Sequence, residues 1–184
     1  NNLGTPQGGV ISPLLANIYM HLIDRIVNNP KRIFGQSGIK IIRYADDFVL
    51  MGKHISKEVT DNLYGLLDRM DLILNKDKTH QLDAREESFK FLGFTFRYDK
   101  DIYGRPVRYW NVVPNKSSEV KIRGKVGDYL KSHGHYNATL LSKGLNSLVR
   151  GWLNYYDVPG VSYVSMSKRR LRYYMSRRIY RYYN

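Results

Sequence analysis

Apolar residues recur every three or four positions along two N-terminal segments, which is the spacing of one face of a helix. The first segment predicts a helix from Ser12 to about Asn28, with Ser12 as its N-cap and Pro13 at its first position. The second predicts a helix capped by Ser56. The apolar positions are Leu14, Ile18, Leu22 and Ile26 in the first helix, and Val59, Leu63, Leu66, Leu67 and Met70 in the second.

Between these helices, residues 39–50 are rich in β-branched and aromatic side chains and predict two strands that meet near Ala45-Asp46-Asp47. The expected turn lacks the Asn-Gly pair that an ordinary tight hairpin prefers, so we expect this tip to serve chemistry. Further strands are predicted at Leu72–Leu74, Phe89–Tyr98 and Val107–Val113.

After Pro114 the pattern becomes helical and stays so to the C-terminus. The predicted fold class is therefore α+β, with an antiparallel sheet and packed helices in residues 1–114 and an all-helical domain in residues 115–184. The three helices of the second domain are expected near Ser118–Ser132, Ala138–Tyr156 and Val164–Tyr182.

Charge is unevenly distributed along the chain, whose formal net charge is +14. Residues 1–100 carry 14 Lys/Arg and 12 Asp/Glu, whereas residues 101–184 carry 16 and 4, interleaved with tyrosines. A basic surplus of this kind is typical of a surface that follows a nucleic-acid phosphate backbone. A solvated basic face, or a surface that binds acidic lipids, is the alternative.

The absence of cysteine excludes disulfides and thiolate metal sites, so any metal must be bound by oxygen or imidazole ligands. The longest apolar stretch, Val10 to Ile23, is interrupted by polar residues, and we expect neither a membrane span nor a secretion signal. We expect a bacterial cytoplasmic protein, with an organellar location as the alternative. The sequence leaves open whether the protein forms a homodimer.

Asp46 and Asp47 place two carboxylates side by side at the expected hairpin tip. Two like charges about 4 Å apart repel by roughly 4 kcal/mol at an effective dielectric constant near 20, and a bound cation offsets this repulsion. Magnesium prefers oxygen ligands and keeps waters that phosphate oxygens can replace. Two-metal phosphoryl transfer would need a further carboxylate from another strand. For the pair alone, a solvated turn is the alternative.

The segment Tyr44-Ala45-Asp46-Asp47 resembles the catalytic signature of reverse transcriptases, and other segments resemble further motifs of that family in the same order. Gly4 to Tyr19 is similar to the loop and helix that lie against template and nucleotide. Leu74 to Thr79 is similar to the segment that follows, and Phe91 to Phe94 to the primer grip. Arg150 to Tyr156 resembles the maturase, or thumb, domain of group II intron-encoded enzymes.

The resemblance implies that residues 1–114 form the C-terminal portion of a polymerase palm, without the fingers and the first palm strand. Residues 115–184 would form a helical thumb/maturase domain. The catalytic residues would be Asp46, Asp47 and Lys78, with Lys76 as the alternative to Lys78. Both aspartates would bind magnesium. Template and nucleotide binding would belong to Pro6, Gln7, Gly8, Gly9 and Tyr44. The primer grip would be Leu92 and Gly93, with a bulged strand as the alternative explanation of this glycine.

RNA binding is expected of basic residues near the C-terminus, whose phosphate contacts would make binding fall steeply with salt. These are Arg150, Lys168, Arg169, Arg170, Arg172, Arg177, Arg178 and Arg181. The last helix is expected to dock through an apolar stripe and to expose its basic side. The stripe is Leu171, Met175 and Ile179. Trp152, Tyr155 and Tyr156 also have helical spacing, and we interpret them as core residues more readily than as nucleic-acid contacts.

The resemblance also implies a third metal-binding aspartate, on a strand upstream of the glycine-rich loop Asn1–Gly9, which would complete a site for two magnesium ions. Aspartates on the predicted helices are poor substitutes for it; they are Asp24, Asp61, Asp68 and Asp71. We therefore expect this chain to be the C-terminal part of a longer enzyme and to synthesise no DNA by itself. Whether a nuclease domain follows stays open.

The function that the resemblance implies is RNA-directed DNA synthesis of the group II intron type, which copies an RNA template from a DNA primer with deoxynucleoside triphosphates and aids intron splicing. Two alternatives stay open. One is an RNA-binding maturase module without polymerase activity of its own. The other is a bacterial reverse transcriptase outside introns, serving defence, sequence diversification or a CRISPR locus.

Overall fold

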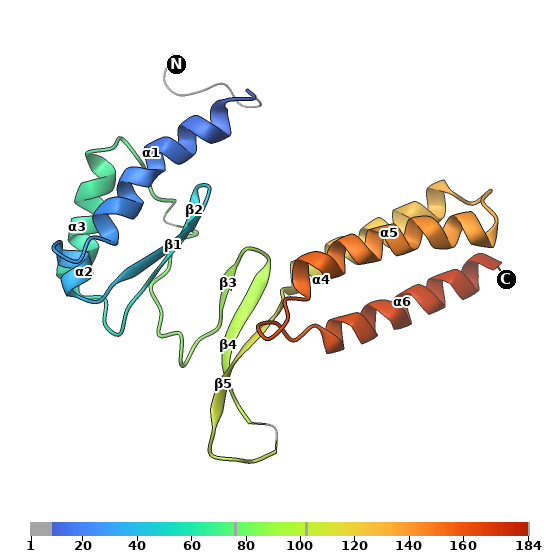
Figure 1. Cartoon of the computed structure of the whole chain (residues 1–184). Coiled ribbons are helices and arrows are strands. Elements are labelled where there is room, and N and C mark those ends of the chain that lie inside the picture. The colour runs from blue at the N-terminus through green and yellow to red at the C-terminus, as the bar shows by residue number, and fades with distance from the viewer. Residues whose placement is uncertain (1–8, 76, 102, 184) are drawn as a thin grey trace. The chain divides into compact units, whose positions relative to one another are not determined.

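The structure, a computed structural model, describes residues 9–75, 77–101 and 103–183. Helices and small antiparallel sheets are both present, which confirms the α+β class (Figure 1). The chain divides into two compact units between His80 and Gln81.

The first unit contains helices α1 (Ser12–Val27), α2 (Ile33–Gln36) and α3 (Lys57–Asp68) and the strands β1 (Lys40–Tyr44) and β2 (Asp47–Met51). The two predicted helices and both strands are confirmed, whereas the four-residue α2 carries no periodic signal and was not predicted. One detail of α1 was wrong, because Ile11 occupies the N-cap position and Ser12 is the first helical residue.

The cap of α3 agrees with the prediction, since the Ser56 hydroxyl accepts a hydrogen bond from the Val59 amide at 3.3 Å. The strand predicted at Leu72–Leu74 was wrong. After Met70 the backbone turns through Asp71, whose φ is +50°, and Ile73 is 98% exposed. In the described part of this unit, only β1 and β2 pair as strands.

Strands β1 and β2 pair as an antiparallel hairpin, with Ile41 opposite Leu50 and Tyr44 opposite Asp47. Because side chains alternate between the two faces, Ile41 and Leu50 lie on the face that packs onto the helices. The buried core of the unit comprises Ile23, Val27, Phe34, Ile39, Ile41, Val59, Leu63, Leu66, Leu67 and Met70. The hairpin therefore has one face held by the core and one face free of it.

The second unit begins with a three-stranded antiparallel sheet of β3 (Phe89–Phe91), β4 (Phe94–Lys100) and β5 (Arg108–Pro114). A single strand was predicted from Phe89 to Tyr98, and this was wrong. The chain instead reverses at Leu92 and Gly93, whose φ angles of +48° and +80° make a tight two-residue hairpin loop.

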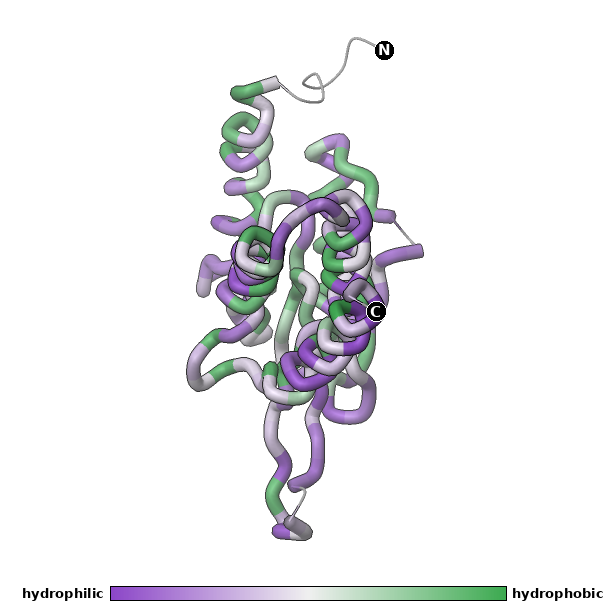
Figure 2. Tube along the Cα trace, turned by 90° about the vertical axis from the view of Figure 1, so that its right-hand side faces the viewer, coloured by the Kyte–Doolittle hydropathy of each residue, from purple (hydrophilic) through white to green (hydrophobic). Residues whose placement is uncertain are grey.

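Three helices follow, α4 (Lys116–Ser132), α5 (Ala138–Tyr156) and α6 (Ser165–Tyr183), each within two residues of its predicted position. Helix α4 packs against both α5 and α6 through Val126 and Leu130. Much of α6 is hydrophilic, as the purple tube leading to the C-terminus shows in Figure 2. Its apolar stripe docks as predicted, with one residue buried and two partly buried; these are Leu171, Met175 and Ile179.

Candidate functional site

Asp46 lies at the tip of the β1–β2 hairpin, in a two-residue loop that it forms with Ala45. Tyr44 pairs with Asp47 across this loop, so their side chains share one face of the hairpin with Ile42. That face is open to solvent, since Tyr44 is 66% and Ile42 50% exposed and both aspartates are exposed. The two carboxylates can therefore be approached from outside the unit.

The loop backbone is strained, because Ala45 has a φ of +54°. Two-residue hairpin loops require a positive φ at their first position, where glycine is usual. For a residue with a Cβ atom this conformation costs roughly 1–2 kcal/mol. The position of Asp46 thus depends on other contacts that hold the loop in place.

Arg43 supplies these contacts. Its Nη1 atom donates to the Ala45 carbonyl at 2.8 Å and to Asn17 Oδ1 at 3.1 Å, while Nε and Nη2 donate to the Asp24 carboxylate at 3.0 and 2.7 Å. The Arg43 side chain is only 11% exposed. Its hydrogen bonds with Asp24, together with the charge of that carboxylate, raise the pKa of the guanidinium above its ordinary value despite burial.

Asp24 is the functional residue that sequence reasoning missed, since it was considered only as a substitute metal ligand. A signal was present in the alternation of β1, which places Arg43 on the same face as the buried Ile41. A charged side chain on a core-facing position requires a partner. Asn17 and Asp24 lie seven residues apart on α1, so they share one helix face and could have been suggested as that partner.

The donor set at the tip fits part of a magnesium site, because two adjacent carboxylates offer oxygen ligands and leave room for waters. Within residues 9–75, 77–101 and 103–183, no group of three or more acidic or histidine side chains is arranged to hold a metal ion. Asp46 and Asp47 could therefore contribute to a magnesium site but do not form a complete one among these residues.

The other residues predicted around the nucleotide are only partly described. Pro6, Gln7 and Gly8 lie outside the described residues, as does Lys76. Gly9 is half-buried, and its carbonyl accepts a hydrogen bond from the Ser12 amide at 3.2 Å. Lys78 has an exposed side chain and lies in a turn that its amide closes by donating to the Asn75 carbonyl at 3.1 Å.

The predicted primer-grip residues form the β3–β4 turn, and the helices of the same unit hold both of their carbonyls. The Leu92 carbonyl accepts from the Tyr155 hydroxyl at 2.9 Å. The Gly93 carbonyl accepts from the Asn115 amide at 2.8 Å and from the Ser118 hydroxyl at 3.2 Å. The turn is thus anchored to the start of α4 and the end of α5.

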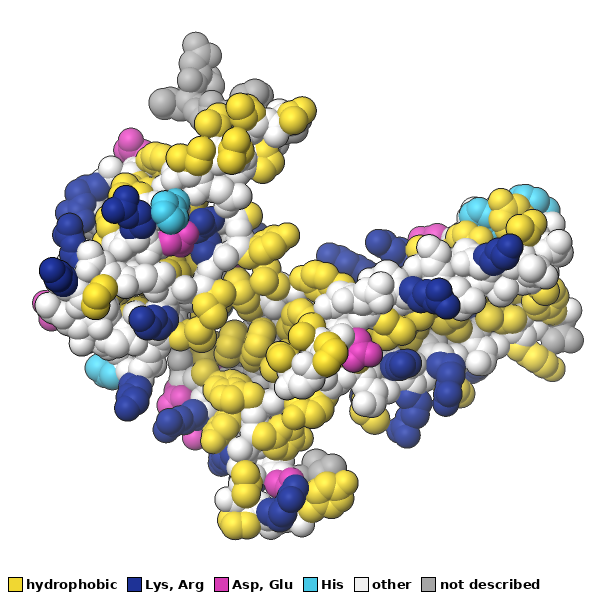
Figure 3. Space-filling model, in the orientation of Figure 1, with side chains coloured by type: hydrophobic (Ala, Val, Ile, Leu, Met, Phe, Trp, Pro, Cys, Tyr) yellow, Lys and Arg dark blue, Asp and Glu magenta, His cyan; other side chains and the backbone are white. Residues whose placement is uncertain are grey.

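All eight basic residues predicted to bind RNA have exposed side chains, and seven of them lie on α6. In Figure 3, dark-blue Lys and Arg side chains gather on the side of the second unit that α6 forms. At 3.6 residues per turn, Arg169, Tyr173 and Arg177 share the helix face opposite the buried Leu171. The Arg177 guanidinium lies 5.8 Å from the centre of the Tyr173 ring.

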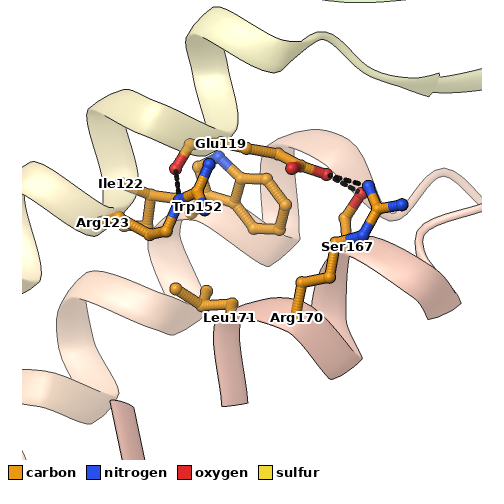
Figure 4. A pocket seen from close by; sticks show the side chains of 7 residues that line it. All are labelled: Glu119, Ile122, Arg123, Trp152, Ser167, Arg170 and Leu171. Atoms are coloured by element: carbon orange, nitrogen blue, oxygen red, sulfur yellow. Dashed lines mark hydrogen bonds and ion pairs between the residues drawn. The ribbon is translucent and has the colours of Figure 1, made fainter. Parts of the chain in front are cut away.

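Two further arginines of this set have partners within the protein. Arg178 lies over the Tyr174 ring, and its Nε donates to the Tyr174 hydroxyl at 3.1 Å. Arg170 lies 3.6 Å from the buried carboxylate of Glu119, which also accepts from the Ser167 hydroxyl at 2.6 Å (Figure 4). These contacts join α6 to α4, so Arg170 has a structural role besides any contact with RNA.

The cavity beside Glu119 is too small for a substrate. It measures about 10 Å³ and is lined by side chains of all three helices, including Trp152 (Figure 4). The buried Nε1 atom of Trp152 has no hydrogen-bond partner among the residues that the structure describes. This volume is on the order of one water molecule.

In the part of the chain that the structure describes, no helix is long and apolar enough to cross a bilayer.

Two family models match the chain. The model described as reverse transcriptase (RNA-dependent DNA polymerase) matches residues 1–96, and the model described as the group II intron maturase-specific domain matches residues 120–184. The first match contains the hairpin with Asp46 and Asp47, and also the turn at Leu92 and Gly93. The second contains all the basic residues predicted to bind RNA.

The chain is also similar to individual proteins. Protein YkfC of Escherichia coli K12 is 30% identical over 145 residues, which cover 62% of this chain and 38% of YkfC. The group II intron-encoded protein LtrA of Lactococcus lactis subsp. cremoris is 61% identical over 31 residues, 17% of this chain and 5% of LtrA.

An uncharacterized 91 kDa protein in the cob intron of Schizosaccharomyces pombe is 50% identical over 36 residues, 20% of this chain and 4% of that protein. The chain spans well under half the length of these curated relatives. From the two family matches and the likeness to LtrA, the chain belongs to the reverse transcriptases and, among them, to the group II intron reverse transcriptase/maturases.

Proposed function

We propose that this chain carries the catalytic hairpin of an RNA-directed DNA polymerase. The observation that supports this most directly is the exposed tip at which Asp46 and Asp47 stand, held by Arg43 within the segment that the reverse transcriptase model matches. Residues 1–114 would be a portion of the polymerase palm, and residues 115–184 its thumb/maturase domain. The relatives are longer than this chain, so the activity is proposed for the intact protein.

In the proposed reaction, the 3′-hydroxyl of a DNA primer attacks the α-phosphate of a deoxynucleoside triphosphate. A new bond forms between the hydroxyl oxygen and the α-phosphorus, while the bond from the α-phosphorus to the oxygen that bridges to the β-phosphate breaks. Pyrophosphate leaves, and the hydroxyl proton passes to solvent. Asp46 and Asp47 would hold magnesium together with an aspartate outside the described residues, and the bound ions would lower the pKa of the attacking hydroxyl and neutralise charge on the leaving group. Lys78 would donate a proton to the leaving pyrophosphate.

The decisive experiment compares primer extension by the intact protein and its Asp46→Asn variant on an RNA template. We expect extension to fall by at least about a hundredfold, because the neutral amide loses the charge that holds the metal. Affinity for the template should change little, since the substitution touches no basic residue. Asp61→Asn, at an exposed position of α3, is the matched control. Extension by Asp46→Asn at the wild-type rate would overturn the proposal.

A second function is proposed for the helical domain, which would bind structured intron RNA and aid splicing. The exposed basic side of α6 supports this, together with the match to the maturase-specific model. The same match favours an intron-encoded enzyme over a reverse transcriptase outside introns. The two functions reside in different parts of the chain, so they can be separated by substitution.

A further inference from the structure

The end of α5 has two adjacent tyrosines whose hydroxyls both serve the Leu92–Gly93 turn. The Tyr155 hydroxyl donates to the Leu92 carbonyl directly. The Tyr156 hydroxyl donates at 2.6 Å to Ser118, whose hydroxyl in turn donates to the Gly93 carbonyl. Tyr155 thus bonds directly to the Leu92 carbonyl, and Tyr156 is linked to the Gly93 carbonyl through Ser118.

These contacts determine where the backbone amide of the turn points. A peptide unit is planar and trans, so its carbonyl and its N–H face opposite directions. Because the Leu92 carbonyl faces Tyr155, the Gly93 N–H is directed away from that side chain. Gly93 itself has a φ of +80°, and an added Cβ atom there would overlap the Tyr156 hydroxyl. Only glycine fits this turn without rearrangement.

Tyr155 differs from its neighbour in burial. Tyr156 is 8% exposed and belongs to the core, as the sequence predicted, whereas Tyr155 is 53% exposed. The Tyr155 ring stacks on Phe94 with a centroid distance of 5.8 Å, which places its hydroxyl beside a residue 63 positions earlier in the chain. A hydrogen bond this open to water adds little to the stability of a protein.

We propose that Tyr155 is a positioning residue for the primer: its hydroxyl orients the Leu92–Gly93 peptide so that the Gly93 N–H donates to a phosphate oxygen of the primer strand. This rests on the proposed polymerase function and extends it. Tyr155 lies in the segment that the maturase model matches, and Gly93 lies in the segment that the reverse transcriptase model matches. By orienting the Gly93 N–H, the first segment would take a direct part in DNA synthesis.

The first test is Tyr155→Phe in the intact protein. The substitution keeps the stacked ring and removes only the hydroxyl. We expect the kcat for primer extension to fall roughly three- to tenfold, as for the loss of one neutral hydrogen bond. The melting temperature should fall only slightly, and the affinity for RNA should stay unchanged. The matched control is Tyr103→Phe, since Tyr103 is 78% exposed and lies in the β4–β5 loop.

The second test probes the phosphate contact itself. A series of primers would each carry one neutral methylphosphonate, at a different linkage near the 3′ end. The wild type should extend most slowly the primer whose methylphosphonate replaces the linkage that Gly93 contacts. With Tyr155→Phe, the same substitution should slow extension less, because the amide is no longer aligned with that linkage. If the methylphosphonate slows extension by the same factor in Tyr155→Phe and in the wild type, the positioning role of Tyr155 is refuted. It is also refuted if no linkage is sensitive in the wild type.

Failure of the inference can be told from failure of the proposed function. If Tyr155→Phe extends primers at the wild-type rate while Asp46→Asn is inactive, the polymerase assignment stands and the role of Tyr155 is refuted. If Asp46→Asn extends primers normally, the polymerase assignment itself fails and the inference falls with it. Gly93→Ala, which adds a methyl group where the Tyr156 hydroxyl lies, should slow extension at least as much as Tyr155→Phe.

Discussion

A single arginine side chain joins helix α1 to the tip of the β1–β2 hairpin. Arg43 uses one edge of its guanidinium for the Asp24 carboxylate and another for Asn17 and the Ala45 carbonyl. Asp46 is the residue after Ala45, whose carbonyl accepts a hydrogen bond from Arg43. The proposed metal ligand is thus positioned by a residue that would itself touch neither metal nor substrate.

Arg43→Lys is the substitution that tests this arrangement. Lysine keeps the charge but cannot form the planar fork that bonds to Asp24 and the Ala45 carbonyl together. We expect the hairpin to open more readily by about 1–2 kcal/mol, so that amide exchange of residues 40–51 becomes roughly five- to thirtyfold faster. Hydrogen exchange read by mass spectrometry measures this directly.

The control for that measurement is Arg69→Lys, an exposed arginine at the C-cap of α3 in the same unit. It should leave the exchange of residues 40–51 unchanged. Equal exchange in Arg43→Lys and the wild type would mean that the guanidinium does not hold the tip.

The candidate site was predictable from the sequence wherever a residue acts through its position in a motif. The roles proposed for Asp46, Asp47 and Gly93 come from such motifs, and the structure places these residues at two tight turns. Residues that act through a contact distant in sequence were not identified. Asp24 and Tyr155 reach their partners 19 and 63 positions away, and neither partner can be read from local periodicity.

At the scale of elements, α4 and α5 pack closely at Gly144. A Cβ atom at this position would overlap the hydroxyl and the ring of Tyr129 on α4. Gly151, on the same helix, has open space around it. The two glycines of α5 therefore have opposite roles, one allowing close helix packing and the other only reducing helix propensity.

Substitution of each glycine by alanine should separate these roles. We expect Gly144→Ala to destabilise the helical unit by about 1–3 kcal/mol, because Tyr129 must move out of a packed interface. Gly151→Ala should stabilise it by about 0.5–1 kcal/mol through helix propensity alone. Thermal unfolding followed by circular dichroism gives both values, and changes of the same sign in the two variants would contradict this account.

Helices were predicted more accurately than strands. The helical period of α3 to α6 extends over three or more turns, so local pattern and tertiary packing agree. The segment from Phe89 to Tyr98 carries an aromatic residue at nearly every second position, and this spacing alone does not show where a strand ends. The reversal at Leu92 depends on a positive φ that leucine seldom adopts, and contacts from two later helices support it.

At the scale of the whole molecule, the positive charge is concentrated late in the chain, where α6 carries seven Lys/Arg and no acidic residue. Arg169 and Arg177 lie on the face of α6 that points away from its apolar stripe. Unlike Arg170, they are placed to meet phosphates without disturbing the contact with α4.

Replacing both by glutamine should weaken the binding of structured intron RNA and reduce its salt dependence. If each arginine neutralises one phosphate, the slope of log K against log salt should become less steep by about 1.4–1.8. Affinities measured over a series of potassium chloride concentrations give this slope. Splicing should suffer more than simple primer extension.

The matched control removes two charges from the first unit through Lys53→Gln and Lys57→Gln, both exposed. It should leave the slope nearly unchanged. An equal loss of slope in both double variants would show that net charge alone, rather than the α6 face, determines RNA affinity.

The ion pair between Glu119 and Arg170 joins α4 to α6, so a phosphate that binds Arg170 would affect the contact between these helices. A phosphate that drew Arg170 away would leave an acidic group in a nearly dry environment with Ser167 as its main remaining partner. Such a group recruits water, which loosens the packing of the last helix. The RNA contact proposed for α6 and its contact with α4 would therefore compete for one side chain, Arg170.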